Sequence, residues 1–337
     1  MNIFVTGSEG FIGSHLVEKL IIKGHKVKAL ILYNDHNNYG WLDTVDKKIK
    51  KEIEFKLGDI RDFDFINSQT KKTDIIFHLA ALIGIPYSYA SPFSYLKTNI
   101  EGSMNIFKAS INNNVKQLIH TSTSEVYGSA KYIPIDERHP LNAQSPYAAS
   151  KVAADQMAIS FYDSYDLPVT TIRPFNTYGP RQSARAVIST IILQAINGNK
   201  INLGQISSTR DFTYISDTVD GFVKAINNKK TIGETINLGT GYEIAIKDLV
   251  KMIGKLMKKN LVISHDKMRF RPKKSEVNRL LSKNTKAKKL LKWKPKLYNK
   301  KGLNEGLKLT IDWFEKNINE INFKSKIYNQ WIGLQIT

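Results

Sequence analysis

Two short segments of the chain carry side chains that can move protons. Thr123, Ser124 and Glu125 supply hydroxyls and a carboxylate, and further along Tyr147 and Lys151 supply a phenol and an ammonium. Tyr147 and Lys151 lie one helical turn apart in a segment with helical character, so both project from one face. A phenol with an unperturbed pKa of about 10 needs a neighbouring cation to accept protons at neutral pH. We expect Lys151 to lower the pKa of Tyr147, and the four groups together suffice for an elimination of water.

A glycine-rich turn near the N-terminus predicts a dinucleotide site. Three evenly spaced glycines follow the apolar run at residues 3–5 and open a segment with helical periodicity. Glycines there let backbone N–H groups and the helix N-terminus approach a pyrophosphate. The residues assigned to this contact are Gly7, Gly10, Phe11, Ile12 and Gly13.

The end of the second predicted strand bears on the choice between NAD and NADP. An acidic residue there binds the adenosine ribose of NAD, whereas an arginine suits the 2′-phosphate of NADP. The chain reads Ile31-Leu-Tyr-Asn-Asp35, so Asp35 lies slightly late and no Lys or Arg replaces it. NAD is favoured on Asp35, and NADP stays open.

Two further segments suit the walls of a cofactor cleft. Asp59 and Ile60 follow the third predicted strand, and Asp59 would accept the adenine amino proton. His78 ends the fourth strand and is interpreted as a packed histidine. The small residues Ala80 and Ala81 after it would let the backbone lie along the second half of the dinucleotide.

The pattern of apolar runs predicts an α/β fold with a doubly wound parallel sheet, a Rossmann domain. Near-continuous apolar runs at residues 3–5, 26–33, 52–57, 74–79, 117–122 and 169–173 alternate with helix-length segments. We expect this domain to span residues 1–175, with return segments near 212–240 that include a strand at 235–238. Residues 176–337 would form mainly a smaller, mixed α/β lobe, with a helix at 187–197 and a strand at 201–203.

Composition sets limits on location and partners. The 337 residues carry a net charge of +20 and no cysteine, which makes a disulfide scaffold impossible. No leader-like segment precedes the first strand and no apolar stretch is long enough for a membrane span, so we expect a cytoplasmic protein. Lysines crowd residues 255–301 without interleaved aromatics, which favours a solvated lysine face over a nucleic-acid or membrane partner.

Several motifs together resemble the extended short-chain dehydrogenase/reductase family of nucleotide-sugar enzymes, and the likeness covers nearly the whole chain. They are Gly7-x-x-Gly10-x-x-Gly13, His78-Leu-Ala-Ala81, Thr98-Asn99, the Thr-Ser-Glu run at 123–125, Tyr147-x-x-x-Lys151 and Arg173-Pro-Phe-Asn176-Thr-Tyr-Gly-Pro-Arg181. Residues 85–88, 124–128 and 181–185 most resemble the nucleotide-linked N-acetylglucosamine 4,6-dehydratases of legionaminic-acid-type pathways. The resemblance implies that Leu79, Ala80, Ala81, Asn99, Tyr147 and Lys151 contact the cofactor.

The resemblance implies oxidation of the sugar at C4, elimination of water across C5 and C6, and return of hydride to C6. Tyr147 would take the proton of the 4-hydroxyl, Thr123 would hold that hydroxyl, and Glu125 would remove the C5 proton. Sugar 4-epimerases of the family usually carry small residues at the position of Glu125, so this residue separates dehydratase from epimerase. Ser124 departs from the aspartic acid of dTDP-glucose dehydratases, so either Glu125 acts twice or a water or Ser124 relays the proton.

The resemblance also implies a nucleoside-diphosphate-sugar as substrate, either GDP- or UDP-linked. The residues assigned to it are Ser88, Thr123, Asn176, Arg185, Leu203, Arg210, Arg271 and Glu276. Arginine suits phosphate oxygens because its planar donors form paired hydrogen bonds. A homodimer through the helices near 99–112 and 145–163 is expected by analogy with the family.

Three alternatives stay open at this point. Two are enzymes of the same fold, a UDP-glucuronate decarboxylase and a nucleotide-hexose 4-epimerase. The third is a dinucleotide sensor or nucleic-acid-binding protein on a Rossmann body. The intact set of Thr123, Glu125, Tyr147 and Lys151 argues against the third, because a sensor needs no such set.

Overall fold

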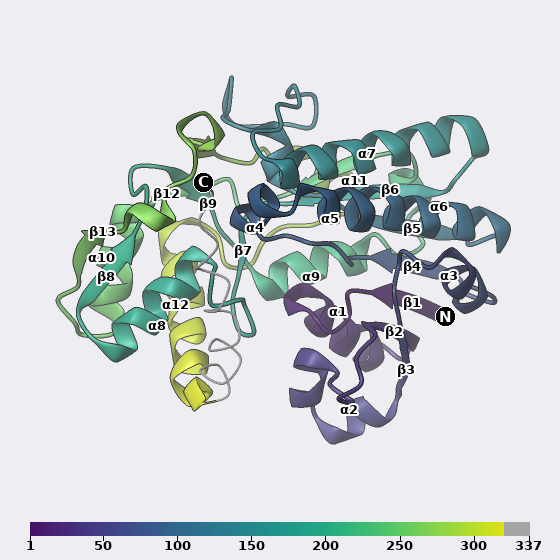
Figure 1. Ribbon diagram of the computed structural model, residues 1–337, viewed down its shortest axis with the longest axis horizontal. Coiled ribbons are helices and arrows are strands. Elements are labelled where there is room, and N and C mark those ends of the chain that lie inside the picture. The colour runs from purple at the N-terminus through teal and green to yellow at the C-terminus, as the bar shows by residue number, and fades with distance from the viewer. Residues whose placement is uncertain (320–337) are drawn as a thin grey trace.

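A seven-stranded parallel sheet forms the centre of the larger part of the molecule. The structure is a computed structural model that describes residues 1–319. The strands lie in the order β11-β6-β5-β4-β1-β2-β3, and every pairing is parallel (Figure 1). Their bounds are β1 (Asn2–Thr6), β2 (Lys26–Leu32), β3 (Ile53–Gly58), β4 (Ile75–His78), β5 (Gln117–Thr121), β6 (Val169–Pro174) and β11 (Thr235–Leu238). The order reverses between β1 and β4, which is where doubly wound sheets bind ligands.

Apolar residues on both sides of the strands explain why helices cover both faces of the sheet. In β1, Ile3 and Val5 belong to one buried cluster and Phe4 belongs to another. The first cluster includes residues of α1 (Phe11–Ile22), α9 (Ile215–Lys224) and α11 (Thr285–Leu290). The second includes residues of α3 (Phe63–Gln69), α6 (Gly102–Asn112) and α7 (Pro146–Tyr165). Alternate side chains of a strand point to opposite faces, so each strand feeds both cores.

Short helical segments connect the strands of the sheet. The segment between β2 and β3 contains the 3-10 turn Gly40–Thr44 and α2 (Lys47–Lys51). Between β4 and β5, α4 (Ile85–Ala90), α5 (Pro92–Tyr95) and the π-helical turn Leu96–Glu101 precede α6. The 3-10 turn Ser124–Tyr127 follows β5 after Ser122 and Thr123.

A smaller lobe, seen at the left of Figure 1, has its own apolar core. Its helices are α8 (Val187–Asn197), α10 (Ile246–Leu256) and α12 (Asn299–Lys316). Its strands form three small sheets: β8 (Lys200–Leu203) with β13 (Val262–His265), β7 (Thr177–Tyr178) with β10 (Thr213–Tyr214), and β9 (Thr209–Asp211) between β12 (Glu243–Ala245) and β14 (Arg279–Leu280). The mixture of parallel and antiparallel pairings agrees with the mixed α/β lobe predicted from the sequence.

The predicted elements correspond closely to those in the structure. The six predicted apolar strands are β1 to β6, and the segment at 235–238 returns to the main sheet as its edge strand β11. Helix α9 begins at Ile215, directly after β10. Residues 320–337, which the sequence analysis places in the second lobe, lie outside the described residues.

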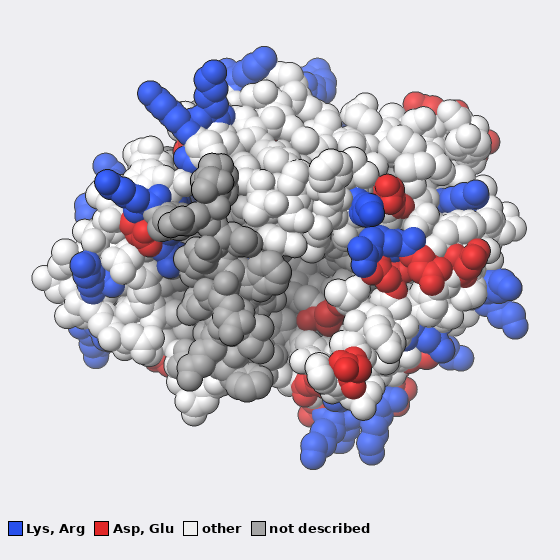
Figure 2. Space-filling model, in the orientation of Figure 1, with Lys and Arg blue, Asp and Glu red and all other residues white. Residues whose placement is uncertain are grey.

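Charged side chains are spread over the surface and do not form one continuous basic stripe on the face seen in Figure 2. Lys and Arg project around the edges of both lobes there, with Asp and Glu interspersed over the sheet-containing part. Among residues 1–319, no helix combines the length and apolar character needed to cross a membrane.

Candidate active site

The catalytic pair predicted from spacing lies at the start of α7. Ser145 caps this helix, because its hydroxyl accepts a hydrogen bond from the N–H of Ala148 at 3.1 Å, and Pro146 occupies the first helical position. Tyr147 and Lys151 follow one turn apart and are both buried. A well-defined helix start therefore places the phenol and the ammonium on one face beside the end of β5.

The Thr-Ser-Glu run lies opposite this helix, in the turn that follows β5. The hydroxyl of Thr123 accepts a hydrogen bond from the N–H of Glu125 at 3.2 Å and also bonds the phenol of Tyr147. Ser124 and Glu125 are buried. The carboxylate of Glu125 is close enough to act electrostatically on Tyr147. The structure thus brings all five predicted catalytic residues into one cluster.

The pKa of Tyr147 departs from the expectation. Burial raises it well above its ordinary value, and the hydrogen bond with Thr123 offsets only part of that effect. The ammonium of Lys151 donates to the main-chain oxygen of Thr121 at 2.6 Å, and burial lowers the pKa of Lys151 to about 8. The prediction that Lys151 lowers the pKa of Tyr147 is therefore wrong for this arrangement. Desolvation dominates, and the Lys151 ammonium would have to turn from Thr121 toward the phenol to offset it.

A buried polar network behind Lys151 was not foreseen from the sequence. Asp155, one turn beyond Lys151, accepts hydrogen bonds from Ser122 at 2.7 Å and from Arg173 at 2.8 and 3.0 Å, and it contacts His120 at 3.2 Å. Burial alone would raise the pKa of Asp155, but these partners lower it to about 2. Its negative charge in turn raises the pKa of Lys151 against the effect of burial. The i, i+4 spacing from Lys151 to Asp155 is the signal that could have revealed it.

The glycine turn has the shape that a pyrophosphate requires. Gly7 adopts φ of 66°, and a Cβ there would lie 2.7 Å from the N atom of Ala80. A Cβ on Gly13 would lie 2.0 Å from the carbonyl oxygen of Gly7, so only glycine fits. Phe11 and Ile12 form the first turn of α1, whose N–H groups have no partner within the helix. This cradle, which side chains would fill, fits a dinucleotide.

The segment after β4 is held against the glycine turn. The hydroxyl of Thr6 accepts hydrogen bonds from the N–H groups of Leu79 and Ala80 at 3.2 and 3.1 Å. Asn99 is buried and bonded on both sides, because its oxygen accepts from Leu82 N at 2.8 Å and its nitrogen donates to Ser150 at 2.9 Å. Asn99 therefore ties the predicted cofactor wall, which includes Ala81, to α7.

His78 is the packed histidine that its position predicted. Its ring nitrogens bond the hydroxyl of Thr6 at 2.8 Å and that of Ser103 at 2.9 Å. Burial lowers its pKa well below the ordinary value, so the ring stays neutral.

The residues predicted to contact the adenosine are arranged differently from that prediction. The side chain of Asp35 is 77% exposed and pairs with its neighbour His36 at 3.1 Å. Asp59 is engaged by Arg61, whose Nε lies 2.9 Å from Oδ2, and this pairing lowers the pKa of Asp59. The side chain of Ile60 is buried against Gly102, which leaves only its backbone for a ligand.

Two arginines and two carboxylates meet at the predicted substrate end. Arg271 NH1 lies 3.4 Å from the carboxylate of Glu125, and Arg210 NH2 lies 3.7 Å from Glu276. Arg210 is buried and also lies near Arg271 and Glu125, and burial lowers its pKa. The predicted diphosphate clamp and the predicted catalytic carboxylate thus belong to one continuous charged cluster.

The segment that carries Arg271 and Glu276 is tied to the Rossmann domain. Ser275 contacts the hydroxyl of Tyr89 in α4 at 2.5 Å and donates to the carbonyl oxygen of Gln144, just before α7. The side chain of Gln144 donates to the carbonyl oxygens of Lys274 and Glu276. These contacts hold the arginine-bearing segment beside the catalytic helix.

The remaining predicted substrate residues differ in accessibility. Asn176 has a buried side-chain oxygen without a hydrogen-bond partner in the described part of the chain, as expected of a group that awaits a ligand. Arg185 is exposed, and its guanidinium lies beside Gly84 and Tyr95, whose ring packs against Tyr147.

Leu203 and Ser88, like Arg210, are predicted substrate residues that are buried. Leu203 ends β8 within the apolar core of the second lobe. Ser88 is fully buried and its hydroxyl donates to Ile85 O at 2.7 Å, which places it in the packing of α4 and away from a ligand surface.

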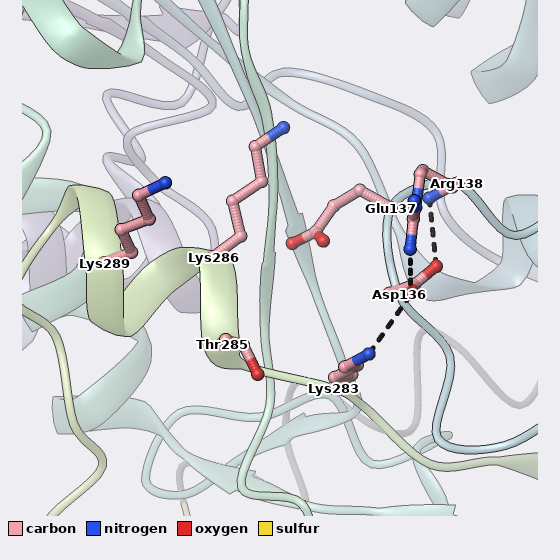
Figure 3. A pocket seen from close by; sticks show the side chains of 7 residues that line it. All are labelled: Asp136, Glu137, Arg138, Lys283, Thr285, Lys286 and Lys289. Carbon is pink, nitrogen blue, oxygen red and sulfur yellow. Dashed lines mark hydrogen bonds and ion pairs between the residues drawn. The ribbon is translucent and has the colours of Figure 1, made fainter.

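A surface pocket elsewhere on the molecule contains no predicted site residue. In Figure 3 Asp136 is contacted by Arg138 and Lys283, at 3.7 and 3.5 Å. The pocket is lined by Asp136, Glu137, Arg138, Lys283, Thr285, Lys286 and Lys289. Because most of these charges are already paired, the pocket offers less to a ligand than the cluster around Tyr147 and Glu125.

The chain is similar to nucleotide-sugar enzymes over most of its length. Residues 4–306 match the model of the family described as GDP-mannose 4,6 dehydratase. A UDP-glucose 4-epimerase of Mycolicibacterium smegmatis is 33% identical over 93% of this chain and 98% of its own length. The human dTDP-D-glucose 4,6-dehydratase is 31% identical over 94% of this chain and 90% of its own.

A solved structure agrees in fold. DesIV, a dTDP-glucose 4,6-dehydratase of Streptomyces venezuelae determined with NAD and TYD bound, superimposes with a TM-score of 0.82. It is 26% identical and the match covers 95% of this chain and 98% of that one. Epimerases and dehydratases are thus similar to the chain to about the same degree, so overall similarity does not choose between them.

The Asp155 network gives a testable dependence of stability on pH. The folded-state pKa of about 2 lies below the ordinary value of 3.8, so the stabilisation is complete above that value and is lost as pH falls toward 2. We expect Asp155→Asn to lose roughly 2 kcal/mol or more of folding stability at pH 7. The variant should also lose less stability than the wild type between pH 4 and 2, as measured by denaturant midpoints.

Asp163→Asn, on the exposed side of the same helix, serves as the control and should behave as the wild type. Equal stability of Asp155→Asn and wild type at pH 7 would contradict the assigned role.

Proposed function

The chain belongs to the NAD-dependent epimerase/dehydratase family of extended short-chain dehydrogenases/reductases, and we propose that it is a nucleotide-sugar 4,6-dehydratase. The proposed substrate is a GDP- or UDP-linked N-acetylglucosamine and the product its 4-keto-6-deoxy derivative. The observation that carries the proposal is Glu125, a buried carboxylate between the Tyr147 cluster and Arg271.

The position of Glu125 favours elimination over epimerisation. Inversion at C4 needs one acid–base group at the 4-hydroxyl, a role that Tyr147 and Thr123 fill. A carboxylate beside that pair has no task in inversion, whereas elimination requires a base for the proton at C5. Burying a carboxylate is costly unless it is paired, and the contact of Glu125 with Arg271 provides that pairing while leaving the carboxylate beside Tyr147.

The chain's own residues divide the proton transfers among them. Tyr147, once ionised, takes the proton of the sugar 4-hydroxyl. The Lys151 ammonium would have to turn from Thr121 toward the phenolate to stabilise that charge. NAD, when bound, supplies a reversible hydride acceptor for C4 and donor for C6. The resulting ketone acidifies the hydrogen at C5, and Glu125 removes it as the C6 hydroxyl leaves. Overall one water is lost and the cofactor is regenerated.

The leaving hydroxyl must receive a proton, and Ser124 is a poor acid. We propose that Glu125 returns the proton it took from C5 to the departing oxygen at C6, so that one carboxyl group acts twice. Ser124 is buried next to it and would orient the hydroxyl by a hydrogen bond. When hydride returns to C6, C5 must regain a proton. The proton that Tyr147 took from the 4-hydroxyl returns to the enolate oxygen at C4 and, on tautomerisation to the ketone, is replaced by one at C5, so the protons balance without an external acid.

The arginine cluster suits the diphosphate of the substrate. Arg210 and Arg271 come from different segments of the second lobe and face the same cluster. A diphosphate would draw Arg271 toward its oxygens and release part of the Arg271 interaction with Glu125. Substrate binding would thereby free the carboxylate for catalysis.

A 4-epimerase is the second candidate, favoured by the 33% identity with the UDP-glucose 4-epimerase. Mass spectrometry of UDP- and GDP-N-acetylglucosamine after incubation with the purified protein distinguishes the two. The proposal expects a product lighter by one water from at least one substrate. A product of unchanged mass with C4 inverted would establish the epimerase, and loss of carbon dioxide from UDP-glucuronate would establish a decarboxylase.

Replacing Glu125 by Gln should separate the half-reactions. The change removes the base but leaves Tyr147 and Thr123 in place, so oxidation at C4 continues while elimination slows by about 10²- to 10⁴-fold. We expect reduced cofactor to accumulate, together with a 4-keto sugar that still carries its C6 hydroxyl. Absorbance would follow the cofactor and mass spectrometry the sugar. Glu54→Gln, an exposed carboxylate on β3, is the control; undiminished water loss in Glu125→Gln would contradict the role.

We also propose a homodimer through α6 and α7. These helices contact each other and carry apolar side chains that remain exposed, among them Met104, Ile159 and Tyr162. Ile159→Asp should convert a dimer to a monomer in sedimentation experiments, because it places a charge in the apolar contact. Leu309→Asp, at an exposed position of α12, should remain dimeric. A wild-type monomer would contradict this assembly.

A further inference from the structure

Glu9 reaches from the glycine turn to the end of β2. It lies between Gly7 and Gly10, and its Oε1 accepts a hydrogen bond from the N–H of Leu32, the last residue of β2, at 2.9 Å. Its main-chain oxygen accepts from Trp41 N at 3.0 Å. A side chain that starts in the phosphate turn therefore places a carboxylate where the second strand ends.

That location normally holds the acidic residue that reads the adenosine ribose. Leu32 occupies the end of β2 here and has no polar group to offer. Asp35, the acid expected to serve instead, is exposed and pairs with His36. Among the described residues, Glu9 is the carboxylate bonded to the end of β2.

The second oxygen of Glu9 lacks a partner. Oε2 is buried and has no hydrogen bond within the described chain, and burial raises the pKa of this carboxyl. A buried acceptor without a donor is unfavourable, and more so when it is charged. One oxygen is thus already positioned by the protein, and the other is left for a donor that the described chain does not provide.

We propose that Glu9 is the residue that selects NAD over NADP, by accepting a hydrogen bond from the 2′-hydroxyl of the adenosine ribose. The inference rests on the NAD-dependence of the proposed function and names the residue that provides it. A 2′-phosphate at this place would be repelled by the Glu9 carboxylate, which has the same charge. It would also lack the hydroxyl proton that the carboxylate accepts from NAD. The turn at 39–41 lies against Glu9, because Trp41 N donates to its main-chain oxygen, and this turn would have to move to expose Oε2 to the ribose.

Direct cofactor binding to the purified protein tests this without any sugar substrate. Titration calorimetry on nucleotide-stripped wild type, Glu9→Gln and Asp35→Asn would use NAD, NADP and the NAD analogue lacking the adenosine 2′-hydroxyl. For the wild type we expect the analogue to bind about ten- to a hundredfold more weakly than NAD. In Glu9→Gln this difference should shrink to a few-fold and the preference for NAD over NADP should fall at least tenfold.

Asp35→Asn should keep the wild-type pattern, and thermal midpoints should show that both variants are folded. The proposal is overturned if the 2′-hydroxyl effect is absent from the wild type, survives in Glu9→Gln or disappears in Asp35→Asn. Because no turnover is measured, a wrong sugar or a wrong reaction class leaves these outcomes unchanged. Failure of the wild type to bind either cofactor would instead overturn both this proposal and the function on which it rests.

Discussion

The ion pair between Asp155 and Arg173 is the interaction on which the arrangement of the site depends. It joins α7 to β6 inside the protein, and Ser122 and His120 add hydrogen bonds from β5 and the turn beyond it. The two charges are almost completely buried, so each requires the other. The helix that carries Tyr147 and Lys151 is thereby held in one position relative to the strand end that carries Thr123 and Glu125. Preorganisation of this kind is what positions proton-transfer groups within reach of one substrate.

A second charged cluster connects the residues proposed to be catalytic with those proposed to bind the nucleotide. Glu125 faces Arg271, and Arg210 lies among Arg271, Glu125 and Glu276. Because these arginines come from the smaller lobe and the catalytic groups come from the Rossmann domain, a diphosphate bound between them would couple the lobes. The same physical cause, attraction between buried opposite charges, thus explains how the site is assembled and how a substrate would alter it.

Local patterns made much of the fold and part of the site predictable. The apolar strands, the glycine turn and the one-turn spacing of Tyr147 and Lys151 depend on neighbours in sequence, and each was found where expected. The electrostatics of Tyr147 depend instead on burial and on the direction of the Lys151 side chain, which no spacing reveals. Asp35 was chosen for its distance along the chain, yet the carboxylate bonded to the end of β2 is Glu9.

The pairing of the Ser275 segment with α4 and Gln144 likewise joins residues far apart in sequence, and only the tertiary structure places them together.

In the proposed reaction, one site moves hydride from C4 to C6 of the same sugar while Glu125 removes the proton at C5. A substrate deuterated at C4 tests it most directly, with the label located in the product by NMR spectroscopy and mass spectrometry. The dehydratase account predicts that the deuterium appears at C6 of a 4-keto-6-deoxy sugar, in a product that has lost one water. Deuterium that returns to C4 of a sugar with unchanged mass would contradict it.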